Sequence, residues 1–405
     1  MTRVHRLAAA GAAVAAVSVV LAYANGSTGD YTSDAGPTIH ALLDGHFGRA
    51  LATQPIMGSL SVLVRLPFAA LAELTGGGEV AIYRLGCIPC LLVLGFAGLE
   101  LARAMARAGA GRAACLSAAA ICLVNPLTWE ALRLGHPEEL LGAALVMLAA
   151  LYAAQERSLA AGVTLGLALA TKQWAAIAVL PVLAVAPAHR IRLGAIAVVI
   201  AAVLTLPAVI GDTEGFYGAT RQAGWAGERV YPFNAVYPLA PTEDRVISVG
   251  DEMSVVTVRV IPTWIAHLLH PLIVALAIPL TAAALMVRRR FRVEDVFSLL
   301  ALLFLLRCLL DPVDNAYYHV PFVLALAFWE GLAWKRPPLL ALLASLAIWF
   351  AIYKATMCDT VDLRNAVYLV ATVPFALSLC TALFTRGGSA RARERRLRPA
   401  TATGG

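Results

Sequence analysis

Charged residues are scarce in this sequence. Only 14% of its 405 residues are Asp, Glu, Lys or Arg, whereas 60% are hydrophobic. A soluble domain of this length carries far more charge. Long apolar runs recur from one end of the chain to the other and leave no room for a large soluble domain. We therefore expect an all-α, polytopic integral membrane protein with about 12 transmembrane helices.

Several motifs are missing as well. The sequence has no D-x-D, so a metal–nucleotide site of the usual soluble type is unsupported. Its seven cysteines are odd in number and mostly lie inside apolar runs, which argues against a disulfide framework. Cys87 and Cys90 have a C-x-x-C spacing that suits redox chemistry or metal binding, but their apolar surroundings favour buried helix thiols. The net charge of +7 is spread over short clusters, so nucleic acid is not an expected partner.

The apolar runs define the expected membrane spans. They cover roughly residues 6–24, 80–102, 113–128, 137–154, 159–171, 174–187, 193–210, 262–287, 295–310, 318–334, 339–356 and 366–385. Residues 1–385 would form a single membrane domain with two long outer loops, 25–79 and 211–260. A basic cytoplasmic tail, 386–405, would follow it, and such a tail is attracted to anionic lipids.

The distribution of charge predicts the orientation. Most Lys and Arg residues fall in the set of loops that includes both termini, and most acids fall in the opposite set. By the positive-inside rule both termini are cytoplasmic, and the acidic face is outside. The first apolar run could also be a signal peptide cut after Ala24, but it is longer than most signal cores, so an uncleaved first helix is favoured.

The same rule predicts a helical hairpin. Residues 103–112 and 188–192 are both basic, so an even number of crossings must separate them. Residues 159–187 must then form two short helices that meet near Lys172. At ~1.5 Å per residue, 13 residues reach only about 20 Å, short of the ~30 Å hydrocarbon core. Because a cation at that depth requires polar surroundings, we expect Lys172 to face a cleft that opens outward.

The two outer loops have different expected roles. In the first, residues 38–47 read as a short helix. Residues 57–74, interrupted by Arg65 and Pro67, read as an interfacial helix. The second loop, rich in Gly, Pro, Tyr and charge, is expected to cap the cleft.

Four outer segments could converge on one pocket. They are residues 29–34, residues 133–139, Lys172 with Gln173, and residues 307–319. Transfer of a sugar from a lipid phosphate needs a carboxylate base for the acceptor hydroxyl. It also needs positive charge where the phosphate leaves. The candidate base is Asp34, and the residues proposed to bind donor phosphate are Arg133, His136, Lys172, Arg307 and His319.

Each candidate has a structural alternative. Asp34 has the spacing to cap a helix that starts near Pro37. His136 could simply begin a helix, and Arg307 could pair with Asp311 at helical spacing.

For the acidic residues near these candidates, a structural role is favoured over a catalytic or binding role. Glu138 and Glu139 follow Pro137, so we expect them to serve the helix dipole. Asp311, Asp314 and His319 have metal-ligating side chains, but their spacing matches no standard site. The sequence therefore assigns no metal and no other cofactor.

The ordered outer motifs resemble those of the GT-C membrane glycosyltransferases, and among them the bacterial family 87 (DUF2029) type. That group includes polyprenol-phosphate-mannose-dependent mannosyltransferases. Roughly residues 1–340 carry the resemblance, in Asp34 through Leu43-Asp44-Gly45, Arg65-Leu66-Pro67-Phe68, Gly135-His136, Gly162 through Lys172, and Leu180-Pro181. His136 stands where the family often has Gln, and the family's tyrosine-bearing stretch after the first loop Asp is altered to Gly36-Pro37-Thr38-Ile39.

The resemblance implies that Asp34 is a general base and that Lys172 contacts the donor phosphate. It also implies an inverting transfer on the outer face of the cell membrane without a nucleotide-sugar. The expected function is therefore transfer of a hexose such as mannose from a polyprenyl-phosphate donor to a lipid or glycan acceptor. Two alternatives stay open: a transporter or flippase of a polar lipid that uses the same cleft without chemistry, and a non-catalytic assembly partner.

Overall fold

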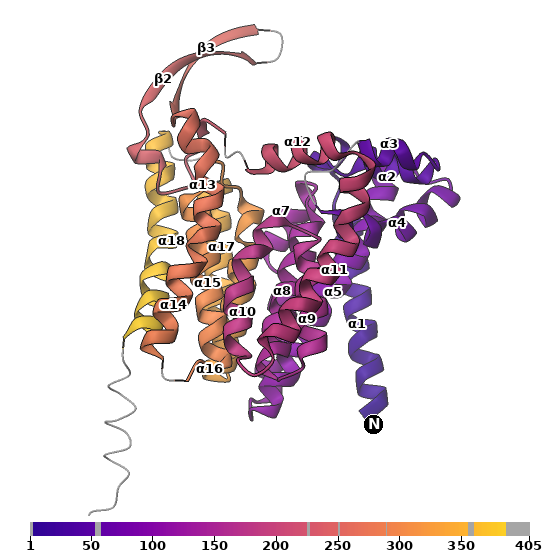
Figure 1. Ribbon diagram of the computed structural model, residues 1–405, viewed down its shortest axis with the longest axis vertical. Coiled ribbons are helices and arrows are strands. Elements are labelled where there is room, and N and C mark those ends of the chain that lie inside the picture. Colours follow the sequence, from indigo (N-terminus) through magenta and orange to yellow (C-terminus); the bar gives the residue numbers. More distant parts are fainter. Residues whose placement is uncertain are drawn as a thin grey trace, which may run out of the picture.

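The computed structural model describes residues 3–52, 58–224, 227–249, 252–288, 290–354 and 360–385. These residues form a body of roughly parallel and antiparallel helices with smaller elements gathered at one end (Figure 1). Within the described ranges, six helices are long and apolar enough to cross a membrane: Glu79–Arg107, Arg112–Arg133, Pro137–Ala154, Arg190–Gly211, Thr263–Val287 and Val361–Phe384. Shorter apolar helices lie at Ala8–Ala24, Ser158–Leu169, Gln173–Val185 and Leu339–Lys354. The structure thus confirms a predominantly helical polytopic fold, and the number of about 12 crossings stays a prediction.

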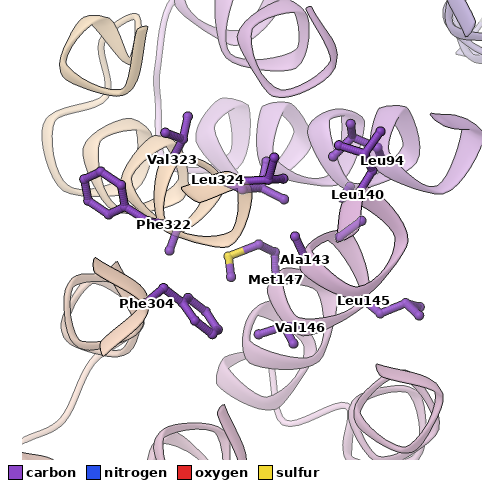
Figure 2. Close-up of a cluster of buried hydrophobic side chains, with 14 of the residues drawn as sticks. Leu94, Leu140, Ala143, Leu145, Val146, Met147, Phe304, Phe322, Val323 and Leu324 are labelled. Atoms are coloured by element: carbon purple, nitrogen blue, oxygen red, sulfur yellow. The ribbon is translucent and has the colours of Figure 1, made fainter. Parts of the chain in front are cut away.

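Helix α8 (Pro137–Ala154) lies at the centre of the body. It contacts α5 (Glu79–Arg107), α9 (Ser158–Leu169), α15 (Val293–Leu310) and α16 (Val320–Trp334). A helix that is apolar on every side is stable only when neighbours surround it. Figure 2 shows the resulting core, in which Met147 of α8 points toward Phe304 and lies close to Leu324.

The predicted spans agree with the observed helices, with local breaks. The other helices that match predicted spans are α1 (Arg3–Ala24), α6 (Arg112–Leu123), α7 (Pro126–Arg133), α10 (Val179–Val185), α11 (Arg190–Gly211), α13 (Thr263–Ala275), α14 (Ala277–Val287), α17 (Leu339–Trp349) and α18 (Val361–Phe384). Asn125 separates α6 from α7, and its side-chain oxygen accepts hydrogen bonds from the backbone N–H groups of Leu127 and Thr128. This N-cap satisfies two donors that the start of a helix leaves unpaired.

The expected break at Lys172 is present. Helix α9 ends at Leu169, and a 3-10 helix, η2 (Gln173–Ala178), leads into α10. The reading of Cys87 and Cys90 as buried helix thiols is also confirmed, since both lie buried and unbridged in α5.

In its described part, the first outer loop contains four short helices. They are the 3-10 helix η1 (Gly29–Thr32), α2 (Gly36–Leu43), α3 (Phe47–Ala52) and α4 (Ser59–Leu74), of which α2 and α4 correspond to the expected helices at 38–47 and 57–74. These elements lie at the end of the body where α1 finishes, uppermost in Figure 1, which we call the upper end. Helix α1 begins, and α18 ends, at the opposite, lower end (Figure 1). The side of the membrane that each end faces stays a prediction, and the predicted basic tail, 386–405, lies outside the described residues.

The second outer loop adds a small β-sheet to this all-α fold. It contains α12 (Thr213–Gly224), the 3-10 helix η3 (Tyr237–Leu239) and three strands, β1 (Arg229–Val230), β2 (Thr242–Val249) and β3 (Glu252–Val260). The strands form an antiparallel sheet in the order β1–β3–β2, with Thr242 opposite Arg259. Its β-branched residues, such as Val255 and Val256, favour strands. The β2–β3 hairpin extends beyond the helical body (Figure 1), and the role of this loop as a cap stays a prediction.

Candidate functional site

Two glycines bring the loop after α1 onto the turn before α8. Gly29 and Gly135 have φ angles of +52° and +92°, which residues with a Cβ rarely adopt. A Cβ on Gly29 would lie 2.2 Å from the carbonyl carbon of Leu134, so the two backbones touch. The Asp30 N–H donates a 3.0 Å hydrogen bond to the Leu134 carbonyl. This approach places the loop acids beside His136.

The ion pairs at the upper end centre on Glu138. We call this group the Glu138 cluster. Its members are Asp30, Arg65, His136, Glu138, Glu139 and Lys172. Glu138 Oε1 lies 2.9 Å from His136 Nδ1 and 3.2 Å from Lys172 Nζ. The second carboxylate, Glu139, lies 3.2 Å from the same ammonium. Both glutamates are buried, and buried carboxylates are stable only when cations and hydrogen-bond donors surround them.

Lys172 enters the cluster through a second backbone contact. The N–H groups of Gly58 and Leu60 donate to the carbonyls of Thr171 and Ala170, at 2.9 and 3.0 Å. Its ammonium lies 3.2 Å from a carboxylate oxygen of Glu138 and of Glu139, and two nearby negative charges favour the charged form of a lysine. The predicted polar surroundings of this lysine are therefore present as two carboxylates. The predicted open cleft stays a prediction, since the Lys172 side chain is only 14% exposed.

Arg65 closes the cluster from the side of α4. Its guanidinium lies 5.1 Å from the Tyr31 ring centroid and 5.9 Å from that of Tyr83. Nη1 lies 3.8 Å from Glu138 Oε2, and both side chains are fully buried. Aromatic faces attract a cation that has lost its water, so the two rings help to hold Arg65 in place.

His136 joins the two acidic sides of the cluster. Nε2 lies 3.1 Å from Asp30 Oδ2, and the ring stacks on Tyr317 at a centroid distance of 4.1 Å. Burial alone would lower the pKa of His136, but the hydrogen bonds to Asp30 and Glu138 raise it to about 9. The same bond lowers the pKa of Asp30. At neutral pH this pair is therefore an imidazolium beside a carboxylate.

Asp34 lies next to the cluster without being neutralised by it. Its N–H donates to the Asp30 carbonyl at 2.9 Å, while no hydrogen bond from a described side chain reaches its carboxylate. Burial raises the pKa of Asp34, and the nearby charges of His136 and Lys172 partly offset that rise. The alternative that Asp34 caps the following helix is wrong, because Ala35 is the N-cap of α2 and no side chain caps it.

Arg307 is a buried cation on the other side of the site. Its guanidinium lies 5.4 Å from the Trp174 ring and 4.5 Å from the Tyr318 ring, and Nη1 donates to the Tyr318 carbonyl at 3.4 Å. No carboxylate of a described residue lies within ion-pair distance of it. The alternative pairing with Asp311 is therefore wrong; Asp311 instead lies 3.1 Å from His270.

Two predicted phosphate ligands belong to other groups of side chains. Arg133 pairs with Glu130 at 2.6 Å and lies over the Tyr353 ring. His319 is buried, with Nε2 2.8 Å from the Tyr368 hydroxyl and 3.3 Å from Asp314 Oδ2. Neither has a contact with the Glu138 cluster among the described interactions, so the structure brings together Asp34, His136 and Lys172, with Arg307 nearby, but not these two.

Four residues of the cluster, Asp30, Arg65, Glu138 and Glu139, were not selected from sequence. Glu138 and Glu139 were assigned to the helix dipole, and Arg65 was read only as an interruption of an apolar run. A signal was available: two adjacent carboxylates at the start of an otherwise apolar 18-residue helix require cations nearby. The sequence does not reveal which cations, because Arg65 and Lys172 come from distant segments.

The only described potential metal ligands that gather closely are Cys308, Asp314 and His319. Their ligand atoms all lie within 4.8 Å of one another, and all three residues are buried. Asp311, the other acid considered from sequence, is paired with His270.

Among known proteins, the chain resembles a solved structure only distantly. No family model matches the sequence, and no curated protein sequence matches it. Among solved structures, the chain is similar to the crystal structure of ArnT from Cupriavidus metallidurans in the apo state. The identity is 16% and the TM-score 0.47, over 95% of this chain and 78% of that one. A likeness this distant carries no argument about function.

Proposed function

We propose that this protein is a membrane glycosyltransferase that moves a hexose from a polyprenyl-phosphate donor to a lipid or glycan acceptor. The observation that carries the proposal is the position of a half-buried carboxylate, Asp34, beside the Glu138 cluster and within the electrostatic influence of His136 and Lys172, at the upper end of a membrane-embedded helical body. A base and an anion-binding group are the two requirements for displacing a phosphate with a hydroxyl. Both are supplied here by segments far apart in sequence.

Asp34 is the proposed general base. Its carboxylate accepts no hydrogen bond from a described side chain and keeps partial exposure, so an acceptor hydroxyl can approach it. The raised pKa makes the ionised carboxylate more basic than that of an ordinary aspartate. In the proposed step the acceptor oxygen attacks C1 of the hexose as the C1–O bond to phosphate breaks. The hydroxyl proton passes to Asp34, polyprenyl phosphate leaves, and this single displacement inverts the anomeric configuration.

The leaving phosphate is assigned mainly to Arg307, because His136 already lies 2.9 and 3.1 Å from carboxylate oxygens of Glu138 and Asp30. Lys172 already lies 3.2 Å from two carboxylates, which reduces its attraction for another anion. Arg307 has aromatic and backbone partners but no carboxylate within ion-pair distance, and a guanidinium binds phosphate oxygens in a bidentate manner. Lys172 then holds Glu138 and Glu139 in place and contributes positive charge at longer range.

The finer assignment rests on the motif resemblance to GT-C family 87. It favours a mannose-type donor, an outer-face site and no nucleotide-sugar. A divalent metal is not required for the step described, because side chains supply both the base and the positive charge.

The proposal is tested by incubating the purified full chain with labelled polyprenyl-phosphate mannose and extracted membrane lipids. We expect label to appear in a new lipid product. Asp34→Asn should lower turnover by about 100-fold or more, the range of general-base effects, with unchanged thermal stability. Asp44→Asn, an exposed acid just beyond α2, is the matched control and should retain activity. Equal turnover in the Asp34→Asn variant and the wild type would defeat the assignment.

The transporter alternative predicts a different result. Movement of the labelled donor across proteoliposomes without any new product would favour it over the enzyme.

A further inference from the structure

A second polar group lies buried on the other side of the 3-10 helix η4 (Ala316–His319). Cys308 comes from the last turn of α15, Asp314 from the loop that follows, and His319 from the end of η4. One ligand atom from each lies within 4.8 Å of the other two. The exposed fractions are 0% for Cys308 and His319 and 5% for Asp314. None of the three belongs to the Glu138 cluster.

The carboxylate of Asp314 is incompletely satisfied. Oδ2 lies 3.1 Å from the Tyr368 hydroxyl and 3.3 Å from His319 Nε2. Oδ1 is buried and has no hydrogen-bond partner among the described residues, and no described Lys or Arg forms an ion pair with this group. Each such deficit destabilises a buried carboxylate, whereas in the Glu138 cluster every carboxylate has a cation nearby.

We propose that Cys308, Asp314 and His319 bind a divalent metal ion of the zinc class. A thiolate, an imidazole nitrogen and a carboxylate oxygen are the ligand types that Zn²⁺ takes, and three protein ligands leave one coordination position for water. Binding releases the thiol proton and any proton held by the carboxyl group. The thiolate and the carboxylate then balance the two positive charges, so the buried site is neutral.

The geometry requires a modest closure. With bonds of ~2.0–2.3 Å, tetrahedral ligand atoms lie roughly 3.3–3.8 Å apart. His319 Nε2 and Asp314 Oδ2 already have that spacing, at 3.3 Å, and the Cys308 sulfur lies within 4.8 Å of the other two ligand atoms, so any closure needed falls on the sulfur. An ion on His319 Nε2 would displace the Tyr368 hydroxyl from that nitrogen, and the hydroxyl would keep its bond to Asp314 Oδ2. His319 Nδ1 lies 3.3 Å from the Asn315 carbonyl oxygen, an outer partner of the kind that orients a metal-binding imidazole.

The ion would fix a helix that also serves the Glu138 cluster. In η4, Tyr317 stacks on His136, Tyr318 covers Arg307, and His319 is the proposed metal ligand. Metal binding at one end of this single turn would therefore hold the two aromatic contacts at the other. The proposed role is structural and does not depend on the glycosyltransferase assignment.

Cobalt substitution tests the site without any activity measurement. The purified full chain is stripped with chelator, loaded with Co²⁺ and desalted. We expect roughly one Co²⁺ per chain and a thiolate-to-cobalt charge-transfer band in the near ultraviolet. Cys308→Ser should lose the band and most of the metal. Cys122→Ser, a matched buried cysteine in α6, should keep both.

Folding is checked separately, so that a loss of metal is not mistaken for unfolding. Circular dichroism and the elution volume of each variant must match the wild type, and His319→Gln provides a second ligand deletion. Zn²⁺ should raise the unfolding temperature of the wild type and of Cys122→Ser but not that of Cys308→Ser. Absence of stoichiometric metal in the wild type, or bound cobalt without a charge-transfer band, would overturn the proposal.

Discussion

Helices α8 and α11 are both long enough to cross a membrane, yet they occupy opposite environments. An 18-residue window of α11 has a mean hydropathy of 2.7, and 17% of that window is buried inside the protein. For α8 the mean hydropathy is 1.4, and 94% of the window is buried. The less hydrophobic helix is thus the enclosed one. Glu138 and Glu139 lower the mean of α8, and their charges require the polar partners that only surrounding protein can supply. Helix α11 has no such requirement, so its apolar side chains can face lipid.

The largest difference between the two regions should come from removing a cation. Lys172→Met leaves Glu138 and Glu139 without their ammonium partner, which should destabilise the protein by about 3–5 kcal/mol. Arg192→Met, at the exposed start of α11, should change stability by less than about 0.5 kcal/mol. Thermal unfolding in detergent, followed by tryptophan fluorescence, measures both. Equal unfolding temperatures for the two variants would contradict the buried ion-pair description.

A cavity in the core should have the next largest effect. Met147→Ala removes a side chain packed near Phe304 and Leu324, and should cost roughly 2–5 kcal/mol (Figure 2). Val203→Ala on α11 removes a side chain that is 64% exposed and should cost far less. The same unfolding measurement applies. A large loss of stability in Val203→Ala would show that α11 packs against something besides lipid.

Raising the pH should lower the stability of the protein through His136 at the start of α8. The pKa of His136 is about 9 when folded and about 6.5 when unfolded, so the folded protein holds this proton more tightly. The resulting stabilisation is complete below about pH 6.5 and is lost as the pH rises through about 9. Unfolding temperatures measured from pH 6 to pH 10 should therefore fall. His136→Gln should flatten this dependence, and a slope unchanged by that substitution would assign it to other groups.

The smallest effects should differ in sign between two glycines. Gly135→Ala forces an L-residue to φ +92° and drives a Cβ to 2.6 Å from the Thr28 carbonyl oxygen, so we expect a loss of roughly 1–3 kcal/mol. Gly194→Ala in α11 meets only ordinary contact, 3.7 Å from Leu183, and should stabilise the helix by about 0.5–1 kcal/mol. Unfolding temperatures give the sign of each change. Stabilisation by Gly135→Ala would contradict the close approach of the two loops.

Much of the helical framework could be predicted from the sequence, and part of the site. Apolar runs gave the position of α8 at 137–154, and the parity of basic loops gave the break at Lys172. The β2–β3 hairpin was not foreseen, because the Gly, Pro and charge of the loop as a whole were weighed above the β-branched residues within it. The partners of Glu138 were not foreseen either, since α5, α6 and α7 separate Arg65 from it, and the rest of α8 and α9 separate Lys172 from it.

By itself the sequence determined the membrane class, the order of the helices and the need for a polar environment at Lys172. These follow from composition, run length and the cost of a charge in hydrocarbon, which are properties of short segments. Only the tertiary structure decided which carboxylates meet that lysine, that Asp34 stays clear of the ion pairs, and that Cys308 lies beside Asp314 and His319. The reason is that ion pairing and ligand geometry act over a few ångströms in space, between residues whose separation along the chain carries no record of that distance.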